Sequence, residues 1–503
     1  MATGLPEDVS LAGLGTQHNV AGGRVRRTKT ALPVVVILAV TLAVRLMLLF
    51  WILHADPSRV RHDDSKSYTN TALALCRTGR LAVSPAMPDV PQTVRTPGYP
   101  VFIAGVYALV GEDVRAVLVV QAVISVATIG VAWLIARALW SSGAALVAVA
   151  ILCVDVVSLA YSQILLTEAL FAFFLTLTVL GGVQLMLGRR ASWAVLVGVC
   201  LALATLVRPI TYYLMFAALI WLGFCELRAR RVRRRLVVVL VSVAAPWLVL
   251  VGGWQVRNFV RTGSPAFSHI VALDLLYRYG ANIVAQRDGI SVEAARDKLD
   301  ATVPGRRAWV MRGGNYQRAN PPKAEWFRRY AKEGRRLAWQ HPFLFIKIHL
   351  RGMAAVVFSP GERQLALNVG LPEPETGPGA DIVRLSPGEY MSKWLGDNRA
   401  RFAAFCLAGA YLAILYVAGA YALVRALQKG PAPVVTHLLI IGVVLYCLAM
   451  SGGTVGGARF RVPIMPLIAV YAAKGLTDVV GGLRARRRAV ARSSDAQSPD
   501  AVE

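Results

Sequence analysis

The run LPVVVILAVTLAVRLMLLFWIL, residues 32–53, decides the fold class of this chain. It holds a single charged side chain, Arg45, and as a helix it would rise about 33 Å at about 1.5 Å per residue. The hydrocarbon layer of a membrane is about 30 Å thick. The run therefore predicts a membrane-spanning helix, and it is too long for the core of a cleaved signal peptide. We expect a retained first span behind a cytoplasmic tail of residues 1–31.

Similar apolar runs recur along the chain. Of its 503 residues 56% are apolar and the mean hydropathy is +0.53, which is more apolar surface than a soluble protein hides in one core. The sequence predicts an all-α integral membrane protein, a bundle of about ten spans over residues 32–480. The further candidate spans are 114–137, 141–157, 163–187, 191–207, 209–227, 235–256, 401–426, 432–450 and 460–479.

The charged residues predict how the bundle is oriented. Lys and Arg outnumber Asp and Glu by 55 to 28, and the basic residues form short blocks beside the apolar runs. If the N-terminal tail is cytoplasmic, ten spans return the other blocks, including the tail 481–503, to the same side, as the positive-inside rule requires. Residues 54–113 and 257–400 are then two outer loops. No nucleotide-binding motif or aromatic-interleaved basic groove accompanies the blocks, which argues against nucleic acid as a partner. The blocks are 24–29, 189–190, 228–235 and 484–492.

The second outer loop has three parts. A polar stretch at 305–322 precedes an amphipathic run at 323–339 and an apolar run at 343–358. The last run contains Lys347 and Arg351, which are costly to expose to lipid. We therefore expect an interfacial helix there in preference to an eleventh span.

The first outer loop places an acidic pair beside the membrane. Asp63 and Asp64 follow the first span closely, and Tyr68 and Ala72 come after them at helical spacing. This predicts an amphipathic helix with the pair at its N-terminus, where the helix dipole tolerates negative charge. From this segment alone, a solvated helix cap is the simpler interpretation. The loop ends in Arg95-Thr-Pro-Gly-Tyr-Pro100, which predicts a stiff turn into another apolar helix.

Ionisable residues also occur within or beside the spans. Glu168 lies just inside an apolar span, where a lone carboxylate costs about 2.5 kcal/mol or more, so it should face a cation or a polar cavity. A structural hydrogen bond between helices is the alternative. Arg208 stands at the mouth of two spans, and Arg45 lies deeper, as a candidate for a structural ion pair.

Arginines near two span ends break the charge rule locally. Arg257 and Asn258 follow the seventh candidate span, and Arg459 and Arg461 follow a Gly-rich turn before the last one. Guanidinium groups beside glycines, which let the backbone approach a ligand, suit a phosphate or pyrophosphate site.

Taken in order, these motifs resemble the GT-C superfamily. The pattern is Asp64, Tyr68 and Ala72, then Arg95 to Pro100, Ser162-Gln163 with Glu168, Pro246-Trp247 with Arg257-Asn258, and Arg459-Phe-Arg-Val-Pro463. It is similar to bacterial relatives of protein O-mannosyltransferases and of the lipid A aminoarabinose transferase. The likeness runs from about residue 32 to 480.

The resemblance implies an inverting glycosyltransferase that uses a polyprenyl-phosphate sugar at the periplasmic or extracellular face of the plasma (inner) membrane. It implies that an acidic residue of the first outer loop is essential, and Asp64 matches its position best, with Asp63 second. Protein O-mannosyltransferases carry Asp-Glu where this chain has Asp63-Asp64, and this departure leaves open which carboxylate acts. The chain ends soon after the last span, so acceptor recognition is expected in residues 257–400. The substrate-binding candidates are Tyr68, Arg95, Tyr99, Glu168, Arg257, Asn258, Arg459 and Arg461.

The expected chemistry is one displacement at the anomeric carbon. Asp64, with Asp63, would act as general base toward an acceptor hydroxyl, and the arginines would hold the departing phosphate. Two adjacent carboxylates also make Mg²⁺ or Mn²⁺ a candidate cofactor. The competing hypotheses are a transporter or lipid flippase without transferase activity, and a membrane scaffold. The sugar (hexose or pentose), the envelope acceptor and the carrier length do not follow from the sequence.

Overall fold

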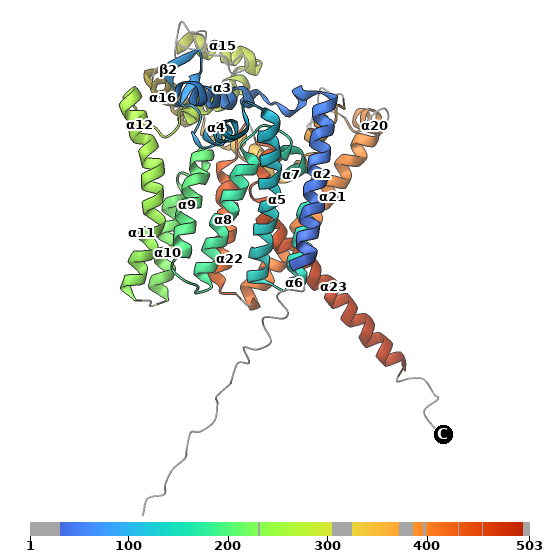
Figure 1. Cartoon of the computed structure of the whole chain (residues 1–503). Helices are drawn as coiled ribbons and strands as arrows, with labels where there is room; N and C mark the ends of the chain where they lie inside the picture. The colour runs from blue at the N-terminus through green and yellow to red at the C-terminus, as the bar shows by residue number, and fades with distance from the viewer. Residues whose placement is uncertain are drawn as a thin grey trace, which may run out of the picture.

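The computed structural model describes residues 31–229, 232–303, 324–371, 386–395, 399–430, 432–454 and 456–495. It is a long helical bundle with a smaller layer of helices across one end (Figure 1). This confirms the all-α membrane fold class. The polar stretch expected at 305–322 and most of the N-terminal tail lie outside the described residues.

All ten candidate spans are largely helical. Among the described residues, seven helices are long and apolar enough to cross a membrane, or up to nine if two bent pairs are each counted as one span. The exact number of crossings therefore stays a prediction. The bundle helices are α2 (Ala31–Ala55), α5 (Val114–Leu139), α6 (Ser142–Cys153), α7 (Val156–Ser162), α8 (Glu168–Met186), α9 (Trp193–Val207), α10 (Leu214–Arg228), α11 (Arg233–Trp247), α12 (Gly253–Thr262), α21 (Arg399–Lys429), α22 (Val434–Met450) and α23 (Met465–Asp495).

Two breaks interrupt the helices of the bundle. Helices α6 and α7 meet at a 55° bend, so α7 forms a separate short helix inside the bundle. Helix α11 contains Pro246 and passes through a π-helical turn, Leu248–Gly252, into α12, as expected where a proline removes a backbone hydrogen bond. Helix α8 also begins five residues later than its predicted span, at Glu168.

Small residues let the bundle helices pack closely. A Cβ on Gly198 of α9 would lie 2.6 Å from the backbone of α11, and one on Gly475 of α23 would overlap the backbone of Ala418 on α21. Close backbone approach at small residues is typical of helix packing within membranes. On the outside of the bundle, apolar side chains such as Leu32 and Met47 of α2 are each 70% exposed, as lipid-facing residues would be.

The basic blocks that the structure describes gather at one end of the bundle, here called the basic end. Arg235 pairs with Glu226 at 3.2 Å and donates to the Arg189 carbonyl at 2.8 Å, which joins two of the predicted blocks. The basic end is the lower end of the bundle in Figure 1, where helix α2 begins and from which α23 extends. The last helix also continues through residues 480–495, where the sequence predicted a separate tail from 481.

The opposite end carries a cap made of the described parts of the two long loops. From the first loop come α3 (Asp63–Thr78), an antiparallel hairpin of β1 (Ala82–Ser84) and β2 (Met87–Pro91), and α4 (Gly98–Val110). The amphipathic helix of the first loop is thus present, whereas the hairpin was not predicted. From the second loop come α13 (Ile270–Leu273), a π-helical segment (Asp274–Gly280), α14 (Ala281–Asp288), α15 (Val292–Thr302) and α16 (Ala324–Gln340).

The second loop builds its own small core. Leu273, Leu276, Phe327 and Tyr330 are buried together, and Val94 of the first loop joins them. The backbone N–H of His269 donates to the Thr93 carbonyl at 2.9 Å, and the Ser268 hydroxyl donates to the Val94 carbonyl at 2.6 Å. The second loop therefore fixes the part of the first loop that precedes Arg95.

Helix α17 (Pro342–Phe358) leaves α16 at a 102° bend. Its Gly352 packs against the backbone of Gly453, while Phe343 is 86% exposed and Lys347 and Arg351 are also exposed. This mixed surface agrees with an interfacial helix, which stays a prediction. Two short helices follow, α18 (Glu362–Asn368) and α20 (Pro387–Leu395).

Candidate active site

Helix α3 presents Asp64 at the junction of cap and bundle. The His62 side chain accepts from the Asp64 N–H, and the Ser65 hydroxyl accepts from the His62 N–H, which together cap the helix. The Ser65 hydroxyl also donates to the Leu165 carbonyl at 2.8 Å. The start of α3 is thus attached to the segment that leads into Glu168.

The two members of the acidic pair face different surroundings. Asp64 is 9% exposed, and its Oδ1 lies 2.5 Å from Arg95 Nη2 while its Oδ2 lies 3.2 Å from Arg459 Nη2. Asp63 is exposed and has no partner among the residues that the structure describes. Of the two candidates, Asp64 is therefore the one placed among the arginines.

Glu168 is wholly buried at the first position of α8. Its Oε1 accepts from Arg208 Nη1 at 3.2 Å and from Arg459 Nε. The expectation of a cationic partner is met by two arginines. Arg459 thereby connects Glu168 to Asp64, although the three residues are far apart in sequence.

Asp64, Arg95, Glu168, Arg208 and Arg459 form one connected set of ion pairs, here called the charge cluster. Three guanidinium groups meet two carboxylates, which leaves an excess of one positive charge. Burial by itself would raise the pKa of Asp64, but Arg95 and Arg459 outweigh burial and hold that pKa below its ordinary value. Asp64 is therefore ionised while both arginines contact it.

The Arg95 motif docks on the end of α9. The Thr96 hydroxyl donates to the Val207 carbonyl at 2.9 Å, and the Tyr99 hydroxyl donates to Gln121 Oε1 at 2.8 Å. A Cβ on Gly98 would come within 2.7 Å of the Leu206 backbone, so only glycine fits there. This docking explains why Arg95 and Arg208, which follows Val207, reach the same cluster.

Aromatic rings line the cluster. The Arg95 guanidinium lies 5.1 Å from the centre of the Tyr68 ring, and Tyr68 meets Tyr99 edge to face. Phe460 lies 4.9 Å from the Arg208 guanidinium and 5.5 Å from that of Arg459. Such contacts favour cations and keep the guanidinium planes in place.

Apart from Tyr68 and Tyr99, which line the charge cluster, three predicted ligands lie outside it. Arg257 donates to the carbonyls of Gln92 and Leu81, and Asn258 donates to the Ala266 carbonyl. Arg461 is 1% exposed and donates to four backbone carbonyls at and just after the end of α17, including that of Ser359 at 2.7 Å. The structure uses these side chains to hold backbone, and Arg461 in particular is not at a surface.

Asp274 is a neighbouring carboxylate that the sequence analysis did not single out. It pairs with Arg278 at 3.1 Å, and the charges of Arg95 and Asp64 act on it. Burial, followed by repulsion from Asp64, raises its pKa against the effect of both arginines. A lone acid in the apolar run IVALDLLY was the only available signal.

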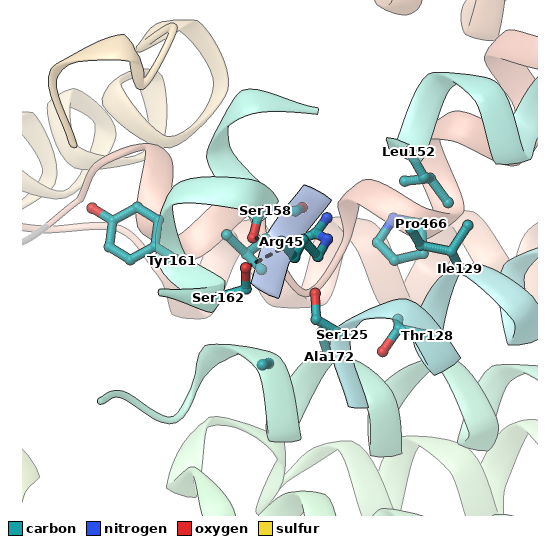
Figure 2. A pocket seen from close by; sticks show the side chains of 12 residues that line it. Arg45, Ser125, Thr128, Ile129, Leu152, Ser158, Tyr161, Ser162, Ala172 and Pro466 are labelled. Atoms are coloured by element: carbon teal, nitrogen blue, oxygen red, sulfur yellow. Dashed lines mark hydrogen bonds between the residues drawn. The ribbon is translucent and has the colours of Figure 1, made fainter. Parts of the chain in front are cut away.

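The structure also shows the surroundings of other polar side chains. Arg45 contacts hydroxyl and carbonyl oxygens (Figure 2), with no carboxylate within 4.0 Å among the described residues. His269 is 5% exposed and stacks on Phe327. Within the described ranges no three His, Cys, Asp or Glu side chains gather as a metal site. Asp63 and Asp64, the candidate metal ligands, are adjacent in sequence.

The fold and site define a multi-pass, all-α membrane protein with a buried set of ion pairs where its cap meets its bundle. Residues 92–254 match the family described as dolichyl-phosphate-mannose-protein mannosyltransferase. This match confirms the GT-C resemblance, over the segment that holds Arg95, Glu168 and Arg208. No curated protein matches the chain in sequence.

Solved structures show more distant likenesses. The chain is similar to the Archaeoglobus fulgidus oligosaccharyltransferase AglB in complex with an inhibitory peptide and a dolichol-phosphate, with 13% identity, 93% of this chain and 52% of that chain covered, and a TM-score of 0.46. It thus spans about half the length of AglB. The chain is also similar to ArnT from Cupriavidus metallidurans bound to undecaprenyl phosphate, with 13% identity and a TM-score of 0.32. The match covers 87% of this chain and 77% of the ArnT chain. At these scores the likenesses carry no argument about the site.

Proposed function

We propose that this protein transfers a sugar from a polyprenyl-phosphate donor to a hydroxyl group of an envelope acceptor, a glycolipid, polysaccharide or protein. One observation carries the proposal: Asp64, Arg459 and Glu168 meet in a charge cluster with one excess positive charge. The family match over residues 92–254 supports glycosyl transfer as the reaction.

The excess charge suits a phosphate-linked donor. The bond between the anomeric carbon and the phosphate oxygen breaks, and its electron pair leaves with the polyprenyl phosphate, whose negative charge grows. Arg95 and Arg459 would hold that phosphate through hydrogen bonds from their guanidinium groups. Both already contact Asp64 in the structure, so a bound phosphate would compete with Asp64 for them.

This competition links donor binding to the base. When Arg95 and Arg459 bind the phosphate, they no longer contact Asp64 and no longer lower its pKa. Burial then raises the pKa of Asp64. Asp64 then takes the proton of the acceptor hydroxyl, whose oxygen forms the new bond to the anomeric carbon with inversion. Glu168 remains paired with Arg208 and with the Nε of Arg459, and it holds these two side chains in position. The donated sugar is a hexose or a pentose.

The location follows the charge asymmetry. With the basic end in the cytoplasm, the cap and charge cluster face the periplasm or cell exterior, and the plasma membrane supplies the donor. Acceptor recognition then belongs to the cap, whose second-loop helices lie beside Arg95.

The test compares two aspartates of the same helical turn. In purified protein, Asp64→Asn should lower sugar transfer by about 10²–10⁴-fold, whereas Asp63→Asn, with its exposed side chain, should keep transfer near the wild-type rate. Full turnover by Asp64→Asn would remove Asp64 from the mechanism. Lipid scrambling by wild-type protein without sugar transfer would favour the flippase hypothesis.

The same assay tests the divalent cation. Asp63 and Asp64 are its candidate ligands, but Asp64 already uses both oxygens on guanidinium groups, which supply the positive charge that a cation would bring. We expect EDTA to leave the rate unchanged. Loss of transfer that Mg²⁺ or Mn²⁺ restores would show a metal at this pair.

A further inference from the structure

Asp274 is a carboxylate of the cap that lies outside the charge cluster. It is the first residue of the π-helical segment Asp274–Gly280, and its Oδ1 lies 3.1 Å from Arg278 Nη1. In the part of the chain that the structure describes, Arg278 is the only side chain paired with it. Since a carboxylate can accept about four hydrogen bonds, Asp274 keeps acceptor positions for a ligand.

Asp274 lies close to the charge cluster. The charges of Arg95 and Asp64 both act on its carboxylate. Burial raises the pKa of Asp274, yet 31% of its side chain is exposed. A side chain that protein surrounds but that stays open on one side lies in a recess, so a substrate held at Asp64 can also contact Asp274.

The π-helical form of the segment places Asp274 and Tyr279 on one face. Hydrogen bonds in a π-helix join residues five apart, and such turns occur frequently at functional sites. With 3.6 residues per turn, an α-helix would turn the two side chains to different sides. Burial, and then the charge of Asp274, raise the pKa of Tyr279 to about 12, which agrees with a shared face.

Tyr279 attaches this face to the Gly-rich turn that leads to Arg459. Its hydroxyl lies 2.8 Å from His349 Nδ1 and 3.2 Å from the Gly452 carbonyl. The cap residues just before the segment hold the backbone that precedes Arg95. The segment is therefore fixed relative to both arginines that are proposed to bind phosphate.

The proposed transfer offers Asp274 two kinds of chemical group. The phosphate of the donor is an anion, which a carboxylate repels and which suits Arg95 and Arg459. Carbohydrate hydroxyls are hydrogen-bond donors, and their hydrogen bonds to a carboxylate are shorter and stronger than those between neutral groups. Asp274 therefore suits a carbohydrate hydroxyl.

We propose that Asp274 is a specificity-determining residue, which accepts hydrogen bonds from carbohydrate hydroxyls held beside Asp64. The inference rests on the proposed sugar transfer and adds to it a residue that recognises the carbohydrate. The hydroxyls belong to the transferred sugar or to a glycan acceptor, and two experimental arms distinguish these sources.

The first arm tests the transferred sugar by binding, without turnover. Purified chain, in a detergent that lacks a sugar headgroup, is titrated by native mass spectrometry with polyprenyl-phosphate mannose, with polyprenyl-phosphate arabinose, and with polyprenyl monophosphate. If Asp274 binds the transferred sugar, Asp274→Ala should weaken binding of a sugar-linked lipid by about tenfold or more, the loss expected for a charge-assisted hydrogen bond. Binding of the monophosphate, which lacks sugar hydroxyls, should not change.

The second arm tests a glycan acceptor by kinetics. Transfer to octyl glucoside and to octyl mannoside is measured at saturating donor. If Asp274 binds the acceptor, Asp274→Ala should raise KM for the glycoside by about tenfold or more, while kcat changes little. The arm that shows the effect identifies the source of the hydroxyls.

Three variants separate recognition from structure. Asp288→Ala removes another aspartate of the cap, one paired with Arg287 and Lys298, and should behave as the wild type does in both arms. Arg278→Gln breaks the ion pair but keeps the Asp274 carboxylate, so its effect should be clearly smaller than that of Asp274→Ala. If Asp274→Ala fails to fold, Asp274→Asn keeps the shape of the side chain and should show the same selective loss.

Equal behaviour of wild type and the Asp274 variants in both arms would overturn the proposal, even where no glycoside accepts sugar. Equal losses for the sugar-linked lipids and the monophosphate would also overturn it, because they would indicate a structural role. If Asp64→Asn abolishes transfer while Asp274→Ala matches the wild type in both arms, this inference alone fails. If the wild type transfers no sugar and binds the sugar-linked lipids no better than the monophosphate, the proposed function itself fails.

Discussion

At the scale of single residues, Arg459 is the centre of the candidate site. It pairs with Asp64 and with the wholly buried Glu168. Burial by itself would lower the pKa of Arg459, but the two carboxylates raise it above its ordinary value. Because a buried carboxylate that loses its partner is far less stable than either a pair or a neutral isostere, Arg459 supports the fold as well as donor binding.

The two contributions of Arg459 are separable. Arg459→Gln should destabilise the protein by about 3–5 kcal/mol, because part of the charge on Glu168 is left uncompensated. It should also lower kcat/KM for the donor by about 10²-fold, with less effect on the acceptor. Thermal unfolding in detergent and donor kinetics measure the two effects.

The matched control is the double variant Glu168→Gln with Arg459→Gln. Removing both charges should restore much of the stability while donor use stays low. Unaltered donor kinetics in the single variant would show that Arg459 does not contact the phosphate.

Residue-scale predictions from the sequence succeeded where the surroundings are local. The place of Asp64 at the start of an amphipathic helix followed from the spacing of Tyr68 and Ala72. The choice between Asp63 and Asp64 did not, because it depends on which side chain faces Arg95 and Arg459. The partners of Arg257 and Arg461 could not be predicted for a related reason: their acceptors are backbone carbonyls, which sequence patterns do not reveal. Their role as ligands stays a prediction.

At the scale of elements, the contact between α4 and α9 positions Arg95. Gly98→Ala should destabilise the protein by about 1–3 kcal/mol, because the new methyl group meets the fixed backbone of Leu206 and Val207. A displacement of Arg95 by about 1 Å should also cost about 10²-fold in transfer. Gly105→Ala, on the same helix in open space, is the control and should be neutral or slightly stabilising. Similar behaviour of the two variants would show that this contact does not position the site.

The docking of the second loop on the first predicts a pH dependence. Burial lowers the pKa of His269 to about 4, below its value of about 6.5 in an unfolded chain. The folded protein therefore binds fewer protons than the unfolded chain between these values, and stability should fall as the pH drops from about 6.5 to 4, by up to about 3 kcal/mol. Above about pH 6.5 His269 should have no effect.

Thermal unfolding at pH 7 and pH 5 measures this dependence. A His269→Gln variant should be less stable at pH 7, because it loses the stacking on Phe327, but it should lose less stability on acidification. Parallel losses in the two proteins would show that His269 is not the group responsible.

At the scale of the whole molecule, the cap and the basic end occupy opposite ends of the bundle (Figure 1). In a variant whose exposed Cys76 and Cys406 are replaced by serine, Asp63→Cys should react with a membrane-impermeant maleimide in intact cells. Arg486→Cys, exposed near the end of α23, should react only after lysis. The reverse pattern would place the charge cluster in the cytoplasm.

The amino-acid sequence by itself determined the helical membrane bundle, its approximate span limits and the gathering of basic residues at one end. These properties add up from local runs, because the length of an apolar helix and the charge of a loop do not depend on distant contacts. Tertiary structure alone decided which arginines meet which carboxylates. Ion pairing depends on side chains that approach within a few ångströms, and residues 64, 168 and 459 are brought that close only when the cap packs on the bundle.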